Sequence, residues 1–296
     1  MSVVKHPPTG LLEAQAGDEV QGRPAPLAYT LLLAGVMATA AVYGLLIDGA
    51  YPAPEGVRPT LPETLRGQDV VNLLAAVALV WGGVRARAGR LLGHVVWLAI
   101  CLYISYTYLM YVVAPYNDAL LLYIAGIGLG AYGLVHGLVR LRERAVAEAF
   151  ADLPRRGLAW FLLVLAGLFA TMWIVDILSV WPGGVPEGLF TYDIPSIVHV
   201  LDLGIVLPLL AITGVMLLRG HPVAPVLAVM LLVKTLTLGL ALLSMNAFIA
   251  ASAGLADPSE PVIWGAVVAV SLAWLVFVLR RMREPDGPWL RPSIWT

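Results

Sequence analysis

The 296-residue chain has little lysine, little cysteine and little charge of either sign. Lys5 and Lys234 are its two lysines, beside sixteen arginines. Cys101 is the single cysteine, so neither a disulfide framework nor a thiolate metal site can form within one chain. Charged residues make up 12% of the sequence, about half of the roughly 25% found in soluble domains. These shortages exclude an ordinary soluble domain.

Long apolar runs fill most of the sequence, and hydrophobic residues make up 60% of it. A run of about 18 or more apolar residues is long enough to cross the hydrocarbon core of a bilayer as a helix. The runs predict an all-α, polytopic integral membrane bundle with about eight transmembrane helices in a single domain, residues 28–280. The expected helices are 28–48, 69–84, 91–113, 119–139, 158–181, 195–218, 223–247 and 262–280.

The basic residues are divided unevenly between the two sets of loops. Fifteen of them fall in the tails and in alternate loops, whereas only Arg58 and Arg66 fall on the opposite side. Because loops rich in Lys and Arg stay in the cytoplasm, both termini are predicted to be cytoplasmic. The polar, proline-containing residues 1–27 are expected to form a disordered cytoplasmic N-terminal tail, and 281–296 a cytoplasmic C-terminal tail.

The longest basic connection, 140–157, carries five arginines and predicts a short amphipathic helix on the membrane surface. The preference for arginine over lysine, with abundant Ala, Gly and Leu, indicates a GC-rich prokaryotic genome. We therefore expect a multi-pass protein of the cell membrane, in a prokaryotic plasma membrane. The lipid bilayer is its expected partner, and no nucleic-acid partner is expected.

Lys234 lies in the middle of the apolar run 223–247. An ammonium group at the centre of a bilayer costs roughly 2.5 to 3.5 kcal/mol on insertion scales, so such a residue usually has a partner and marks a functional site. The predicted topology places two intramembrane carboxylates within reach on other helices, Asp202 first and Asp176 second. Three incidental charges inside a membrane are improbable. The sequence therefore predicts an Asp–Lys pair, either functional or a structural link between helices.

Further polar residues fall in the half of the bilayer that the predicted topology assigns to the outside. Together they predict an outward-facing polar pocket with Lys234 at its floor, built by the second, third, fifth, sixth and seventh helices. The candidate ligand or proton-coupling residues are Lys234, Asp202, Asp176, His199, Asp69, Asn72, Tyr103, Tyr106 and Thr237. Asp69 lies at the predicted start of helix 69–84, where it is equally well explained as a helix N-cap.

Simpler explanations exist for several of the other polar residues. His199 is equally well explained by a bond to a backbone carbonyl. Tyr108 and Tyr111 fit an aromatic belt at the membrane interface better than a pocket. His94 and His136, near the predicted cytoplasmic ends of their helices, are most simply interfacial histidines.

The first functional hypothesis is a transporter, or another membrane protein that binds a small anionic or lipid-like ligand. Two desolvated, interacting charges titrate together, so binding an anion at Lys234 or a proton at Asp202 would change the other group. Pro208 supports this hypothesis because it frees the carbonyl of Gly204, and interrupted helices are common at transport sites.

The second hypothesis is an integral membrane enzyme with a lipid-type substrate and a metal. Its weak candidate ligands are His199, Asp202 and Asp176, whose N and O atoms suit Zn²⁺, Mn²⁺ or Fe²⁺. A haem between His94 and His136 and a retinal Schiff base on Lys234 are weaker alternatives. A non-catalytic membrane subunit is also compatible with the sequence. The sequence thus leaves both enzymatic activity and cofactor open.

Four small residues recur along the helix expected at 119–139. They are Gly126, Gly130, Gly133 and Gly137. Stripes of glycine allow two helices to approach closely. We interpret this stripe mainly as packing within the bundle, with a homo-oligomer interface through this fourth helix as the alternative.

Overall fold

The computed structural model describes residues 22–184, 197–254 and 259–292. In these residues the chain is helical, and eight helices are long and apolar enough to cross a membrane. The predicted fold class, a polytopic all-α membrane bundle, is confirmed. Residues 1–21 and 293–296 of the expected tails lie outside the described residues, and so does the expected start of the sixth helix at residue 195.

Each span has well-defined bounds, and one of them is interrupted. The spans are α2 Leu27–Leu46, α3 Leu61–Arg87, α4 Leu91–Val112, α5 Leu120–Val139, α7 Arg155–Ser179, the sixth span Ile197–Leu218, α10 Ala224–Ala253 and α11 Ser259–Arg281. The sixth span consists of α8 (Ile197–Leu201), a π-helical turn η1 (Asp202–Val206) and α9 (Leu207–Leu218). The connection predicted to be amphipathic contains the short helix α6 (Glu143–Ala149), which buries Ala145, Val146 and Ala149.

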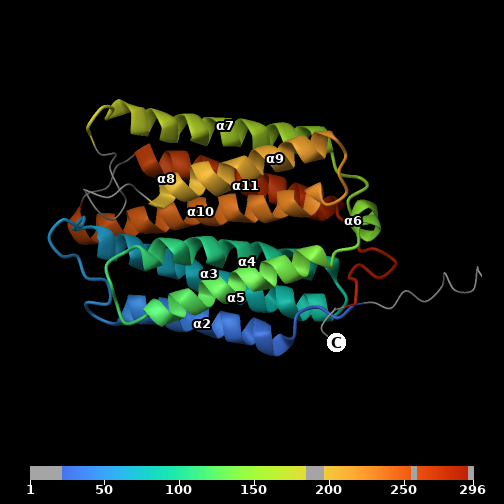
Figure 1. The fold of residues 1–296 in the computed structure, drawn as a ribbon, viewed down its shortest axis with the longest axis horizontal. Helices are drawn as coiled ribbons and strands as arrows, with labels where there is room; N and C mark the ends of the chain where they lie inside the picture. The colour runs from blue at the N-terminus through green and yellow to red at the C-terminus, as the bar shows by residue number, and fades with distance from the viewer. Residues whose placement is uncertain (1–21, 185–196, 255–258, 293–296) are drawn as a thin grey trace, which may run out of the picture.

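The spans form two groups that meet at α10 (Figure 1). In the first group α2 packs against α3 and α5, and α4 packs between α3 and α5. In the second group α7 packs against α9, and α10 against α9 and α11. Helix α10 also packs against α3 and α4 of the first group. Lys234 therefore lies on the helix that joins the two halves of the bundle.

Helix α3 begins at Leu61, eight residues before the start predicted at residue 69. Its first turn contains Pro62 and Glu63, and both residue types favour a helix N-terminus. The prediction was wrong because it treated Glu63 and Arg66 as loop residues. Asp69 is consequently neither an N-cap nor a residue of the helix entrance: at 1.5 Å per residue it lies about 12 Å along the helix.

Helices α3 and α10 approach each other closely at Gly67. A Cβ atom at this position would lie only 2.6 Å from the backbone nitrogen of Met245 in α10. Because the obstacle is backbone rather than a flexible side chain, neither helix can yield without moving as a whole. This contact sets the separation of the two helices at Met245, which also lines the cavity that contains Lys234.

Gly67→Ala is expected to destabilise the protein by about 1–3 kcal/mol, the usual cost of overpacking a well-packed interior. Thermal unfolding of the purified protein in detergent would show this as a lower Tm. Gly128→Ala on α5 is the matched control, because a Cβ there meets no atom within 4 Å. Equal Tm values for the two variants would mean that the α3–α10 contact is not tightly packed.

The glycine stripe on α5 packs against α4 of the same chain. A Cβ at each of its positions would collide with α4 residues, among them Tyr108, Ser105, Trp97 and Leu98. All four glycines are buried. The interpretation as intrachain packing is confirmed, and an oligomer through α5 would have to use the exposed face of this helix.

The segment that follows α11 runs back across one end of the bundle. Leu290 forms an antiparallel bridge with Leu141 and accepts a hydrogen bond from the backbone N–H of Gly22. Glu284 accepts hydrogen bonds from the N–H groups of Leu91 and Leu92 at the start of α4. The C-terminal segment 282–292 thus connects the end of α11 to the first helix group.

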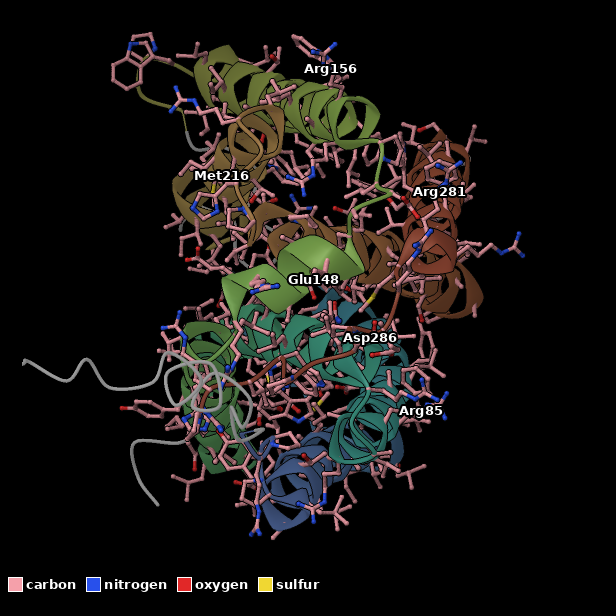
Figure 2. The ribbon with its side chains drawn as sticks, turned by 90° about the vertical axis from the view of Figure 1, so that its right-hand side faces the viewer. Arg85, Glu148, Arg156, Met216, Arg281 and Asp286 are labelled. Carbon is pink, nitrogen blue, oxygen red and sulfur yellow. The ribbon has the colours of Figure 1, made fainter. Side chains whose placement is uncertain are left out.

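The same end of the bundle carries arginines from several connections. Figure 2 views this end and shows Arg85, Arg156 and Arg281 around its rim, with α6 across its middle. This arrangement agrees with the uneven distribution of basic residues in the sequence. That this end faces the cytoplasm stays a prediction.

Candidate functional site

A small cavity of about 60 Å³, with mostly apolar walls and a few polar groups, lies where the two helix groups meet. Five of the nine candidate residues line it: Tyr103, Tyr106, Asp202, Lys234 and Thr237. The other lining residues include Gln68 of α3, Trp173 of α7 and Trp264 of α11. A cavity needs about 10–15 Å³ to hold a water molecule, so this one has room for a few waters or one small ion.

The polar groups of the cavity are almost fully buried, whereas the sequence predicted an open, outward-facing pocket. Lys234, Asp202 and Tyr106 retain only 3%, 4% and 6% exposure. The predicted helices do converge here, since α3, α4, α7, η1 and α10 all contribute. Trp264 of α11 also lines the cavity, although the sequence did not predict that this helix takes part.

Lys234 and Asp202 interact through a tyrosine between them. The Lys234 Nζ atom lies 3.6 Å from the centroid of the Tyr106 ring. The hydroxyl of Tyr106 donates to Asp202 Oδ1 over 2.8 Å. Within the described residues, no carboxylate oxygen lies within 4.0 Å of this ammonium group. The predicted Asp–Lys pair is therefore indirect, through a cation–π contact worth roughly 2 kcal/mol when desolvated.

Asp202 is positioned by irregular backbone. The π-helical turn begins at Asp202, whose carbonyl accepts the N–H of Leu207 five residues later. Pro208 follows directly, and its ring and missing N–H disfavour regular α-helix across the preceding turn. The carboxylate accepts a second bond from Trp173 Nε1, over 3.0 Å. Both oxygens of Asp202 thus have a donor.

A second buried carboxylate lies beside the cavity. Asp69 is 1% exposed and accepts hydrogen bonds from Tyr51 (2.5 Å), Tyr111 (2.8 Å) and Asn72 (3.2 Å). Gly44 makes room for this group, because a Cβ there would collide with Asp69 and Tyr51. Within the described residues no cation lies within 4.0 Å of this carboxylate. Hydrogen bonds alone stabilise Asp69.

A chain of hydrogen bonds connects Asp69 to the cavity. Gln68 donates to the Tyr103 hydroxyl (2.7 Å), and Tyr103 donates to Asn72 Oδ1 (2.7 Å). Asn72 in turn donates to Asp69. Gln68 and Tyr103 line the cavity, whereas Asn72 and Asp69 do not. Polar groups at the cavity wall are thereby coupled to the buried carboxylate.

Tyr103→Phe is expected to destabilise the protein by about 1–3 kcal/mol, because Gln68 and Asn72 each lose a buried partner. Tyr108→Phe is the control: it is an equally buried tyrosine on the same helix, but its hydroxyl makes only one long bond, of 3.5 Å, to Met37 O. Denaturant unfolding in detergent would compare the two. Equal losses would show that the chain of bonds adds nothing to stability.

His199 and Asp176 pair with each other and do not line the cavity. His199 Nε2 lies 2.8 Å from Asp176 Oδ2. His199 is therefore paired with a carboxylate, and not with the backbone carbonyl that the sequence also allowed. The indole of Trp173 stands between this pair and the cavity: its ring contacts His199 edge-on, with centroids 4.6 Å apart, while its Nε1 bonds to Asp202. His199 Nδ1 is buried without a partner, and the Asp176 side chain is 40% exposed.

The metal alternative gains no support from this geometry. In the described part of the chain, no three His, Cys, Asp or Glu side chains gather closely enough to hold a metal ion. Asp202 is bonded to Tyr106 and Trp173 rather than grouped with His199 and Asp176.

The haem and retinal alternatives also lack a matching site. His94 Nε2 lies 3.3 Å from Gly137 O, and His136 Nε2 accepts from Arg140, so the two histidines are held by different groups. For a retinal on Lys234, the cavity of about 60 Å³ is too small in this conformation, because drug-sized ligands occupy roughly 300–1,000 Å³.

Sequence reasoning missed four residues of the two networks: Tyr51, Gln68, Tyr111 and Trp173. The assignment of Tyr108 and Tyr111 to an interfacial belt was wrong, because they are 0% and 2% exposed and packed inside the bundle. The signal for Gln68 was its place beside Asp69, and for Trp173 its place one turn before Asp176. Tyr51 lies in a connection without periodicity, where sequence gives no direction for a side chain.

Comparison with known proteins gives no match, whether to a family model, to a curated protein or to a solved structure. Any function must therefore be argued from the geometry of the chain itself.

Proposed function

We propose that the protein is a membrane carrier that binds a small anion in the cavity around Lys234 and couples this binding to a proton on Asp202. The observation that supports it is a buried ammonium group that lines a small cavity and has no carboxylate oxygen of the described residues within 4.0 Å. Most buried charges are paired. An unpaired one beside an empty volume is a natural site for a soluble counter-ion.

The size of the cavity limits the substrate. With about 60 Å³, the site in this conformation can hold an anion of only a few non-hydrogen atoms. Tyr103, Gln68 and Thr237 supply polar groups at the wall, and Phe169 and Trp264 supply apolar ones. A small monovalent anion such as nitrate, formate or bicarbonate fits this description.

The carboxylate on the other side of Tyr106 supplies the coupling. Ionised Asp202 repels an anion at Lys234, and this repulsion is strong where water is excluded. Protonation of Asp202 removes the repulsion, so proton and anion favour each other's binding by the same free energy. The expected process is joint movement of one proton and one anion.

The placement of the cavity suits alternating access. It lies between the two helix groups, and α10 contacts both of them. A small tilt of one group against the other would open the cavity first to one side and then to the other, as in carriers whose site lies near the bilayer midplane. The π-helical turn and Pro208 add the irregular backbone that is common at such sites.

The direct test uses the full-length protein in liposomes that contain a pH-sensitive dye. Inward gradients of nitrate, formate or bicarbonate are imposed one at a time, with a bulky dicarboxylate for comparison. We expect one of the small anions to acidify the lumen faster than in protein-free liposomes, and the dicarboxylate to have no effect. If no small anion moves protons or changes the intrinsic tryptophan fluorescence, the carrier proposal is wrong.

A membrane enzyme is the second candidate, and the His199–Asp176 pair is the observation that favours it. A carboxylate that bonds to one imidazole nitrogen orients the ring, as in general-base catalysis. Hydrolysis of lipid-type substrates by the purified protein, lost in His199→Ala but retained in Lys234→Met, would support this function over transport.

A further inference from the structure

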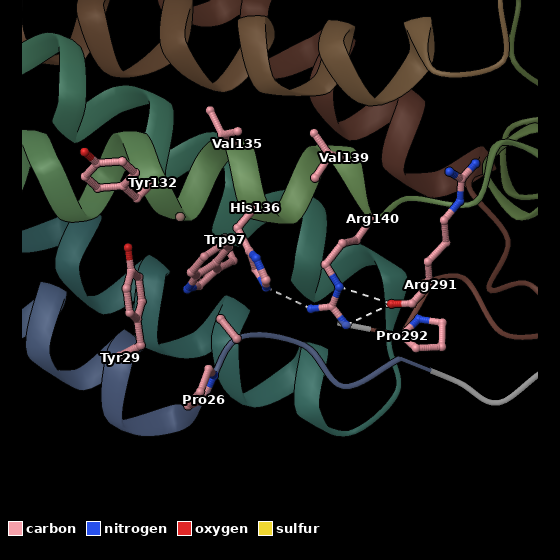
Figure 3. A pocket seen from close by; sticks show the side chains of 12 residues that line it. Pro26, Tyr29, Trp97, Tyr132, Val135, His136, Val139, Arg140, Arg291 and Pro292 are labelled. Carbon is pink, nitrogen blue, oxygen red and sulfur yellow. Dashed lines mark hydrogen bonds between the residues drawn. The ribbon is translucent and has the colours of Figure 1, made fainter. Parts of the chain in front are cut away.

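A second and much larger cavity lies at the arginine-rich end of the bundle. It has a volume of about 630 Å³ and is lined by residues of α2, α4, α5 and the C-terminal segment 282–292 (Figure 3). Its walls include the rings of Tyr29, Trp97 and Tyr132 and the side chains of Val135 and Val139. At this volume it falls within the range of roughly 300–1,000 Å³ that holds drug-sized organic ligands. The proposed carrier function makes no use of it.

A buried cation without an anion lies at one end of this cavity. Arg140 is 7% exposed, and no carboxylate oxygen of the described residues lies within 4.0 Å of it. Its Nε and Nη2 donate to the carbonyl of Arg291, and its Nη1 donates to His136 Nε2 (Figure 3). These bonds use three of the five N–H groups of a guanidinium, which leaves two for a ligand.

The surroundings of Arg140 favour negative charge. Burial lowers the pKa of Arg140 from its ordinary value, which is the direction expected for a cation that lacks an anionic partner. Helix α2 also begins at this cavity, with Pro26 in the wall and no acidic residue in its first turn. The N-terminus of a helix carries a partial positive charge. Both features favour an anionic group in this cavity.

The polarity of the cavity changes along α5. Arg140, His136 and Tyr132 are spaced four residues apart on one helix face, so they cover about 12 Å along the axis. The charged end lies where α5 ends, and the aromatic and aliphatic walls extend toward the middle of the bundle. Tyr132, Val135 and Val139 are 78%, 59% and 65% exposed, so this wall faces the surroundings of the bundle, where acyl chains would lie.

We propose that this cavity binds an anionic phospholipid, with the phosphate at Arg140 and an acyl chain along Val135 and Tyr132. The charge of Arg140 suits the phosphate, its place at the end of α5 suits the level of a lipid headgroup, and the apolar walls suit an acyl chain. A free phosphate would satisfy Arg140 but would leave most of the 630 Å³ unfilled. The inference is independent of the carrier proposal.

The test measures lipid binding to the delipidated, full-length protein in detergent. Phosphatidylglycerol, phosphatidylcholine and inorganic phosphate are added separately, and native mass spectrometry and the Tm report binding. Phosphatidylglycerol is expected to stay bound and to raise the Tm, whereas phosphatidylcholine and inorganic phosphate do neither. Arg140→Gln should weaken phosphatidylglycerol binding about tenfold or more, as expected for lost charge-assisted hydrogen bonds.

Matched variants separate the cavity from the rest of the surface. Arg144→Gln removes a neighbouring arginine whose side chain is 93% exposed, and it should leave binding unchanged. Val135→Trp fills the apolar part of the cavity without touching Arg140 and should also prevent binding. Val164→Trp is its control, because Val164 is 65% exposed on α7, away from this cavity.

If Arg140→Gln fails to fold because it loses its bonds to Arg291, Val135→Trp still tests whether the cavity binds the lipid. Equal binding of both lipids, or equal weakening by Arg144→Gln and Arg140→Gln, would overturn the proposal. An Arg140-dependent rise in Tm with inorganic phosphate as large as that with phosphatidylglycerol would overturn the lipid assignment in favour of a plain anion site. Unchanged phosphatidylglycerol binding in Val135→Trp would do the same.

Discussion

Lys234→Met is expected to abolish anion-driven proton uptake while the protein stays folded and at least as stable as the parent. The ammonium group is 3% exposed and has a ring face rather than a carboxylate as its close neighbour. The cation–π contact that is lost is worth roughly 2 kcal/mol. The cost of keeping a charge inside the membrane, roughly 2.5–3.5 kcal/mol, disappears at the same time. Methionine has a similar length and fills the same volume.

The measurements are proton uptake in liposomes and Tm in detergent, on the same preparation. Ser271→Ala on α11 serves as the control, because this buried hydroxyl has no hydrogen-bond partner and does not line the cavity. A different outcome would identify Lys234 as structural: a large fall in Tm that Asp202→Asn restores. Removal of one member of a buried pair leaves an uncompensated charge, and neutralising the second member relieves it.

Asp69→Leu is expected to lower the free energy of unfolding by about 3 kcal/mol or more, because several buried donors lose their acceptor at once. Tyr51 is the most affected, since its hydroxyl bonds to Asp69 over 2.5 Å. Tyr111 keeps the carbonyl of Leu65 as a second acceptor. The loss of unfolding free energy should therefore be large, but smaller than the sum expected if all three donors of Asp69 lost their only acceptor.

A double-mutant cycle in denaturant checks this expectation. Tyr51→Phe should cost much less in the Asp69→Leu background than in the parent, because the bond is already absent. Asp48→Leu is the control: Asp48 is exposed in the connection after α2, and the change should stay within about 0.5 kcal/mol. Additive losses for Tyr51 and Asp69 would show that the two residues are not coupled.

The fold was predictable because every span must be long enough and apolar enough to cross the same bilayer. The start of α3 was the exception. Glu63 and Arg66 are polar enough to suggest a loop, yet the helix continues through them and Arg66 bonds to Gly44 O over 3.4 Å. Hydropathy measures the average surroundings of a residue, and it cannot recognise a charged side chain that finds a partner on a neighbouring helix.

The sequence predicted which residues belong to the candidate site better than it predicted the contacts between them. The insertion cost of charge identified Lys234, Asp202 and Asp176. The structure buries Lys234 and Asp202, whereas the Asp176 side chain is 40% exposed and pairs with His199 outside the cavity. Asp69, which the sequence explained equally well as an N-cap, is buried in the bundle. That Tyr106 lies between Lys234 and Asp202 was not predictable, because it depends on the rotation of α4 about its axis. The exclusion of the His199–Asp176 pair from the cavity likewise depends on the indole of Trp173, whose direction no sequence pattern indicates.

The C-terminal segment 282–292 links the two helix groups at the arginine-rich end of the bundle. It follows α11 of the second group, and its Glu284 and Leu290 bond to residues of the first. Under the proposed carrier function, those bonds would make the arginine-rich end the pivot, and the close contact of α3 and α10 at Gly67 would have to open. Displacement grows with distance from a pivot, so the same rotation separates the groups most at the opposite end, where α10 finishes at Ala253. A rotation of this kind would give the cavity around Lys234 its first path to water from that end.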